Sequence, residues 1–219
     1  MTKLLYDKYF KTRFPNYSYR DKMWQPVVNY LQRYVPRESV VLDLGAGYCN
    51  FVNHIIAKEK HAADASDIIK KYADKDVICH VKDCTDLNDI PNGKFDVVFE
   101  SNLLEHLELN QVEKTLQEVH RVLKSGGRFI AMQPNFTYFY RNYFDDYTHR
   151  QVFTHIGFVD LLCNYGFEVE HVQPKFLPAT FKEKLPRIPF LVKIYLRSPW
   201  RPKAGQMLVL AKKPENVQN

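Results

Sequence analysis

The chain has 219 residues, of which 45% are hydrophobic and 26% are charged, and its formal net charge is +6. This length suits a single domain, and the apolar content is too high for a largely disordered chain. No stretch approaches the roughly 18 apolar residues of a membrane-spanning helix. The first residues, MTKLLYDKYFKTRF, have no apolar segment like that of a signal peptide, so we expect a cytoplasmic protein.

The four cysteines argue against a metal centre or a disulfide framework. They form no C-x-x-C pair and have no histidine-rich partner spacing, so no metal site is expected and the thiols are expected to be reduced. The cysteines are Cys49, Cys79, Cys84 and Cys163.

Apolar periodicity predicts helices that alternate with strands along the chain. Asp21 is expected to cap a helix over residues 22–34, with Pro26 in its first turn. A buried strand at 40–45 then leads through glycines into a short helix at 50–57. Further strands are predicted near 61–66, 76–83, 94–101, 128–134, 167–172 and 206–213, and further helices near 112–123 and 154–165.

This alternation predicts an α/β fold built on a parallel sheet with right-handed crossovers. Ligands in such folds bind beyond the carboxyl ends of the strands. Three acidic residues lie at such ends, namely Asp43, Asp64 and Asp83. A carboxylate at the end of the second strand is suited to accept the hydroxyls of a ribose.

The loop VLDLGAGYCNF excludes two other nucleotide sites. A nicotinamide-binding loop needs glycine at position 50, where Asn50 stands, and the triphosphate-binding loop needs a Gly-Lys-Ser/Thr sequence that is absent. Cys49 occupies the place of a common third glycine. Cysteine is small and commonly buried, so we interpret Cys49 as a packing residue and not as a reactive thiol.

Three segments, in order, carry a resemblance to a known family. VLDLGAGYCNF resembles motif I of class I S-adenosylmethionine-dependent methyltransferases, while FDVVFESNLLEHL and RVLKSGGRFIAMQPN resemble the segments of the fourth and fifth strands. The resemblance covers roughly residues 22–172. It implies a Rossmann-like, doubly wound and mostly parallel sheet of seven strands with an antiparallel last strand. It also implies S-adenosylmethionine as the cofactor.

The expected organisation is one domain over 1–219, with an N-terminal cover segment at 1–21, a cofactor-binding core at 22–172 and a basic insertion at 173–205. The resemblance assigns roles to matched positions near the methionine part, the ribose and the adenine of the cofactor. Two alternatives stay open, since Asp43 could bind only loop amides and Asp83 could be a turn residue. The implied cofactor-binding residues are Asp43, Gly45, Ala46, Gly47, Asp64, Ala65, Asp83, Cys84, Ser101 and Asn102.

Residues 135–150, NFTYFYRNYFDDYTHR, are expected to select the methyl acceptor. Their aromatic rings suit sugars or planar ligands, and Asp145 and Asp146 suit ligand hydroxyls. His149 is the candidate proton acceptor, and His106 lies beside the same opening. The alternative is that these residues only fix a loop. A divalent ion on Asp145, Asp146 and His149 is not expected, because such sites need more oxygen ligands.

The predicted function is methyl transfer to a small-molecule hydroxyl, on a sugar or nucleotide-linked sugar. The segments FDDYTHR and KFLPATFK resemble a subgroup often encoded among bacterial polysaccharide-assembly genes. The fourth strand lacks the Asn/Asp-Pro-Pro-aromatic motif, which disfavours amino methylation of nucleic-acid bases and a DNA partner. The alternatives are a methyltransferase acting on protein or RNA, and a catalytically silent cofactor-binding module.

Positive charge is concentrated in residues 175–203, which hold eight Lys/Arg and one Glu, a net +7 that leaves the rest of the chain near −1. This segment is expected to cover the acceptor cleft, to attract a phosphate-bearing acceptor, or to rest on an anionic membrane. The alternative is a solvated cover packed on the domain. Arg187, Arg197 and Arg201 are the candidate phosphate ligands, and the protein is expected to be a monomer or homodimer.

Overall fold

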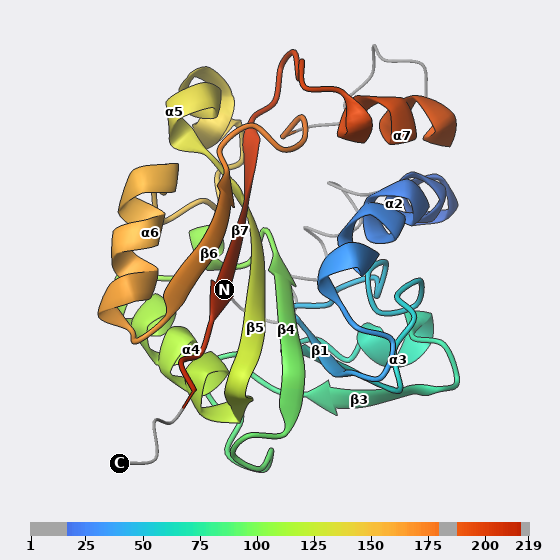
Figure 1. Cartoon of the computed structure of the whole chain (residues 1–219), viewed down its shortest axis with the longest axis vertical. Helices are drawn as coiled ribbons and strands as arrows, with labels where there is room; N and C mark the ends of the chain where they lie inside the picture. The colour runs from blue at the N-terminus through green and yellow to red at the C-terminus, as the bar shows by residue number, and fades with distance from the viewer. Residues whose placement is uncertain (1–16, 180–187, 216–219) are drawn as a thin grey trace.

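The computed structural model describes residues 17–179 and 188–215, which form a central sheet with helices on both faces (Figure 1). The seven strands lie in the order β3-β2-β1-β4-β5-β7-β6. The first five strands in this order are parallel to one another, and β7 is antiparallel to both β5 and β6. This arrangement confirms the predicted fold class. The strands are β1 Val40–Leu44, β2 Glu59–Asp64, β3 Val77–Val81, β4 Phe95–Ser101, β5 Leu123–Pro134, β6 Glu168–Gln173 and β7 Gln206–Lys212.

Helices cover the sheet in two layers. The helices α4 and α6 pack on one face through buried residues such as Leu116 and Phe158. The helices α2 and α7 lie together over the other face, to which they contribute residues such as Val28 and Leu196 (Figure 1). The helical elements are α2 Tyr17–Leu31, η1 Gln32–Tyr34, α3 Ile69–Tyr72, η2 Leu104–His106, α4 Leu109–Val122, α5 Phe136–Phe139, η3 Tyr140–Asp145, α6 His155–Asn164 and α7 Pro189–Arg197.

The central strands are buried on both faces, which explains their nearly continuous apolar sequence. In β1, the residues from Val41 to Leu44 are all buried, and β1 pairs in register with both β2 and β4. Their carboxyl ends therefore meet at one edge of the sheet. The segments that follow Leu44, Asp64 and Ser101 are brought together there.

The expected cap of the N-terminal helix is wrong. The helix α2 begins by Tyr17, so Asp21 and Pro26 both lie inside it. The Asp21 carboxylate instead accepts hydrogen bonds from Asn50 Nδ2 at 3.3 Å and from His54 Nε2 at 2.8 Å. Asn50 and His54 follow the glycine loop, so Asp21 contacts a distant segment of the chain and does not cap its own helix.

The predicted helix at 50–57 is also wrong. Residues 47–54 form consecutive turns with mixed hydrogen bonding, in which Asn53 N–H bonds to Cys49 C=O and His54 N–H to Phe51 C=O. The Val52 N–H donates to the Asp43 side chain at 3.2 Å and so leaves the helical pattern. No helix N-terminus, with the positive end of its dipole, therefore follows the glycine loop in this described segment.

Two other boundaries differ from expectation. The helix α4 ends at Val122 and the strand β5 begins at Leu123, not at the predicted residue 128. The KSGG sequence therefore lies inside the strand. The basic insertion contains a helix, α7, which begins at Pro189, while Arg187 lies outside the described residues. The helix predicted near 154–165 is present as α6, and Thr154 caps it, because Thr154 Oγ1 accepts a hydrogen bond from Gly157 N–H at 3.1 Å. Among the residues described, no helix is both long and apolar enough to cross a membrane.

Candidate active site

The loop after β1 is a tight turn with three residues in the left-handed region of backbone space. Gly45, Gly47 and Cys49 have φ angles of 71°, 49° and 58°. The N–H groups of Gly45 and Ala46 both donate to Ala63 C=O on β2, at 2.8 and 3.2 Å. These bonds tie the loop to the end of the neighbouring strand.

Cys49 occupies the position of a common third glycine. Glycine adopts a positive φ without backbone strain, whereas cysteine adopts it at a cost. The Cys49 side chain is fully buried in a small cluster with Val52, Ala62 and Ile69. Burial raises the pKa of the Cys49 thiol, so the reactive thiolate is disfavoured. The surrounding contacts are those of a packing residue.

Asp64 ends β2 and anchors the glycine loop from the other side. Its Oδ2 accepts the Gly47 N–H at 2.9 Å, and its Oδ1 accepts the Ser66 N–H at 2.8 Å. The next residue, Ala65, is exposed. An ionised carboxylate offers about four acceptor positions, and this makes it a suitable partner for ligand hydroxyls.

Asp43 is buried beneath this loop. Burial raises the pKa of its carboxyl to about 8, although the Val52 N–H lowers it and the Asp64 charge raises it further. This geometry supports the alternative role, in which Asp43 binds loop amides.

Gly45→Ala is expected to destabilise the fold by about 1–2 kcal/mol and to weaken ligand binding at the loop. The added Cβ would lie 3.0 Å from Leu103 Cδ1, and alanine is strained at a φ of 71°. Urea unfolding of wild type and variant measures the loss. The control is Gly157→Ala, where the nearest atom would be Thr154 Oγ1 at 3.5 Å, and equal stability of Gly45→Ala and wild type would contradict the expectation.

The third acidic position differs from the first two. Asp83 is exposed, and its Oδ1 accepts hydrogen bonds from the N–H and the hydroxyl of Thr85 at 2.9 and 2.8 Å. Its neighbour Cys84 is buried, and Thr115 Oγ1 lies 3.4 Å from its sulfur. Asp83 thus shapes a turn at the end of β3.

The segment after β4 turns sharply beside the same edge. Asn102 has a φ of 54°, and its Nδ2 donates to Ser101 Oγ at 3.0 Å. Its Oδ1 accepts a hydrogen bond from Gln206 Nε2 at 2.7 Å. The antiparallel strand β7 therefore holds the end of β4 in place.

The candidate acceptor-binding residues separate into two groups. Asp146 is buried, and its Oδ1 accepts the Thr148 hydroxyl at 2.6 Å, while Thr148 Oγ1 lies 2.9 Å from His106 Nδ1. The rings of His106 and His149 have centroids 5.1 Å apart. Asp145 is exposed and accepts a hydrogen bond from Asn142, so it lies apart from this cluster.

The sequence interpretation missed three members of this site. Glu105 is fully buried beside His106, Thr148 links Asp146 to His106, and the Tyr143 ring packs 4.5 Å from that of His149. Adjacency to His106 was the only sequence signal for Glu105. The apolar neighbours of Glu105 in LLEHL indicated only a packing role for this segment, so Glu105 was not considered as a site residue.

Comparison with known proteins agrees with this geometry. Residues 42–131 match a family model described as a methyltransferase domain. They span the glycine loop, the end of β2 and most of β5. Over this range, which is less than half of the chain, the sequence is similar to that methyltransferase domain.

A curated relative, the sarcosine/dimethylglycine N-methyltransferase of Halorhodospira halochloris, is 30% identical over 115 residues, which is 48% of this chain and 40% of the relative. The chain therefore aligns with less than half of that relative. Two solved structures share the methyltransferase fold over nearly the whole chain. They are a Haloferax volcanii methyltransferase in complex with the Trm112 activator (17% identity, TM-score 0.73, 97% of this chain and 99% of that one) and the Burkholderia thailandensis 1,6-didemethyltoxoflavin-N1-methyltransferase with bound S-adenosylhomocysteine (19%, 0.59, 98% and 92%).

The residues of this edge fit S-adenosylmethionine, the cofactor that the sequence resemblance implies. The left-handed glycine loop allows close backbone approach, and Asp64 places a carboxylate, a group suited to ribose hydroxyls, at the end of β2. The first turns of α2 reach this loop as well, because Arg20 Nε donates to Asn50 Oδ1 at 3.1 Å.

The arginines of the basic insertion have different surroundings. Arg201 donates to the carbonyls of Leu196, Phe176 and Ser198 at 2.8, 3.1 and 3.3 Å, so its guanidinium binds backbone. Arg197 is exposed at the end of α7. Both line a cavity of about 410 Å³ between α2 and α7.

Proposed function

We propose that this protein transfers the methyl group of S-adenosylmethionine to a hydroxyl of a small molecule, with His149 as the proton acceptor. The observation that carries the proposal is the proximity of the His149 and His106 rings just beyond β4, the strand that pairs with β1 and ends beside it. Histidine is the side chain most often used to take a proton near neutral pH.

Bound S-adenosylmethionine supplies an electrophilic methyl group. The chain must orient the acceptor oxygen toward it and remove the hydroxyl proton as the new bond forms. The Tyr143 ring packs against the ring of His149, and the Tyr143 hydroxyl donates to Gln151 C=O. This hydrogen bond fixes Tyr143, which in turn restricts the position of the His149 ring. His106 is oriented through Thr148 by the buried Asp146.

The proposed acceptor is a sugar or a nucleotide-linked sugar. Three aromatic side chains of residues 135–150, the segment that contains His149, are exposed, and aromatic faces pack well on sugar rings. They are Tyr140, Phe144 and Tyr147, exposed by 54%, 62% and 68%.

An amine acceptor is the second candidate, because two of the compared proteins are named as N-methyltransferases. An amine that arrives neutral needs no proton acceptor before transfer. A macromolecular acceptor, protein or RNA, is the third, since the net charge of +7 in residues 175–203 would attract an anionic partner. Steep salt dependence of RNA binding would favour that alternative.

The test is methyl transfer from labelled S-adenosylmethionine to a panel of nucleotide sugars and small amines. His149→Ala is expected to lower kcat for a hydroxyl acceptor by about 10²–10⁴-fold without changing cofactor affinity. His171→Ala is the control, because that exposed histidine lies on β6 and packs on Tyr34. Unchanged kcat in His149→Ala, or turnover of amines alone, would overturn the proposal.

A further inference from the structure

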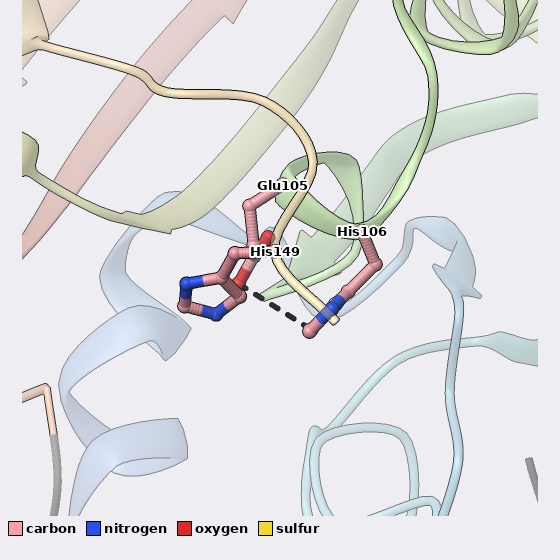
Figure 2. Close-up of side chains that lie close together, drawn as sticks. All are labelled: Glu105, His106 and His149. Carbon is pink, nitrogen blue, oxygen red and sulfur yellow. Dashed lines mark ion pairs between the residues drawn. The ribbon is translucent and has the colours of Figure 1, made fainter. Parts of the chain in front are cut away.

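Two histidines and a glutamate converge beside the proposed acceptor opening. Glu105 and His106 come from η2, just after β4, and His149 comes from the loop that follows η3 (Figure 2). One ligand atom from each of the three side chains lies within 4.8 Å of the others. Segments 43 residues apart thus place three metal-binding groups around one point.

Glu105 is the unusual member of this cluster. Its side chain is only 1% exposed, and neither carboxylate oxygen accepts a hydrogen bond from any described residue. Its ion-pair contact with His106 joins Oε1 to Nε2 at 3.8 Å, which is beyond hydrogen-bond length. A buried carboxylate without hydrogen bonds is costly unless a cation or a proton compensates it.

The hydrogen bonds of Thr148 with Asp146 and His106 determine which ring nitrogen of His106 carries the proton. The Thr148 hydroxyl has one hydrogen, which it donates to the Asp146 carboxylate at 2.6 Å. Thr148 Oγ1 must therefore accept from His106 Nδ1, 2.9 Å away. In the neutral ring the lone pair is then on Nε2, which lies 3.8 Å from Glu105 Oε1, so two groups that can each donate an electron pair to a metal ion are close together.

We propose that Glu105, His106 and His149 bind a divalent transition-metal ion. Two imidazoles and one carboxylate are a ligand set typical of zinc, iron(II) and related ions, whereas magnesium prefers oxygen ligands alone. An ion between Glu105 and His106 would supply the positive charge that the buried carboxylate lacks. Thr148 and Asp146 would orient His106, as carboxylates and hydroxyls commonly do behind metal-binding histidines.

This inference departs from the expectation of no metal, which considered Asp145 and Asp146 as ligands. Asp146 supports the cluster from behind, and Glu105 takes the place of the carboxylate ligand. Binding of the ion does not depend on which acceptor is methylated. If the proposed function also holds, the lone pair of His149 binds the ion and does not accept the proton, and the ion itself would promote loss of the hydroxyl proton by lowering the pKa of an acceptor hydroxyl bound to it.

The experiment is calorimetric titration of the chelator-treated, full-length protein with zinc chloride and, separately, with cobalt chloride followed by absorption. One ion per chain with a micromolar or tighter Kd is expected, with visible cobalt bands. Glu105→Gln and His149→Gln are each expected to weaken binding by at least about tenfold. Retained binding of S-adenosylhomocysteine by each variant checks that it is folded.

The matched control is His80→Gln in a second histidine cluster. There His61 Nδ1 lies 2.8 Å from His80 Nε2, His61 Nε2 lies 2.6 Å from Glu59, and Lys94 also pairs with Glu59, so these groups already satisfy one another. His80→Gln should bind the ion as wild type does. No ion bound by wild type, undiminished binding in Glu105→Gln or His149→Gln, or binding lost in His80→Gln would each overturn the proposal.

Discussion

Asp64→Ala is expected to reduce the affinity for S-adenosylmethionine and S-adenosylhomocysteine by at least about 100-fold. Removal of the carboxylate takes away the acceptor for ribose hydroxyls, and it leaves the N–H groups of Gly47 and Ser66 without their partner. Hydrogen bonds to a charged group contribute about 1.5–3 kcal/mol each. Calorimetric titration of wild type and variant with both ligands measures the loss.

Two further variants separate cofactor binding from folding. Asp64→Asn keeps one acceptor oxygen for a loop N–H, so it should lose less affinity than Asp64→Ala. Asp76→Ala removes an ion pair with Lys60 at the amino end of β3, where the aspartate is 66% exposed. Exposed pairs contribute little, so this control should bind the cofactor normally. Wild-type affinity in Asp64→Ala would exclude the ribose role of this residue.

Glu100→Gln is expected to gain stability relative to wild type as the pH rises from 5 to 8, by about 2–4 kcal/mol over that range. Glu100 is fully buried, and Gln133 Nε2 donates to its Oε1 at 2.8 Å. Burial raises the pKa of the Glu100 carboxyl from its ordinary 4.5 to about 8, although the Gln133 hydrogen bond opposes this. The native state therefore prefers the protonated acid.

The sign follows from proton linkage. Above the unfolded pKa of 4.5, the native state binds more protons at this site than the unfolded chain does, so wild-type stability falls as the pH rises through about 8. Glutamine does not titrate, so the variant loses this slope. Asp43 has a similarly raised pKa and is present in both proteins, so the difference between them isolates Glu100.

Urea unfolding at several pH values measures this difference, and the exposed Glu168→Gln is the control, for which a flat difference is expected. A fixed offset that adds to the pH-dependent difference is compatible with the mechanism, because the amide replaces a carboxyl oxygen in a buried place. Parallel pH profiles of the two proteins would contradict it.

The sequence by itself determined the fold class, the seven strands in chain order, and the place of the glycine loop. These features follow from local patterns, since apolar runs, glycines and helix caps act within a few residues. Asp64 could be singled out in the same way, because the carboxyl end of a second parallel strand lies next to the loop after the first.

Only the tertiary structure decided which side chains from distant segments of the chain interact with one another. Asp21 looked like a helix cap, but contacts with Asn50 and His54 gave it another role. The cluster of Glu105 with His149 depends on two loops that meet only when the sheet is assembled. Hydrogen bonding and burial between such segments depend on three-dimensional proximity, which sequence spacing does not encode.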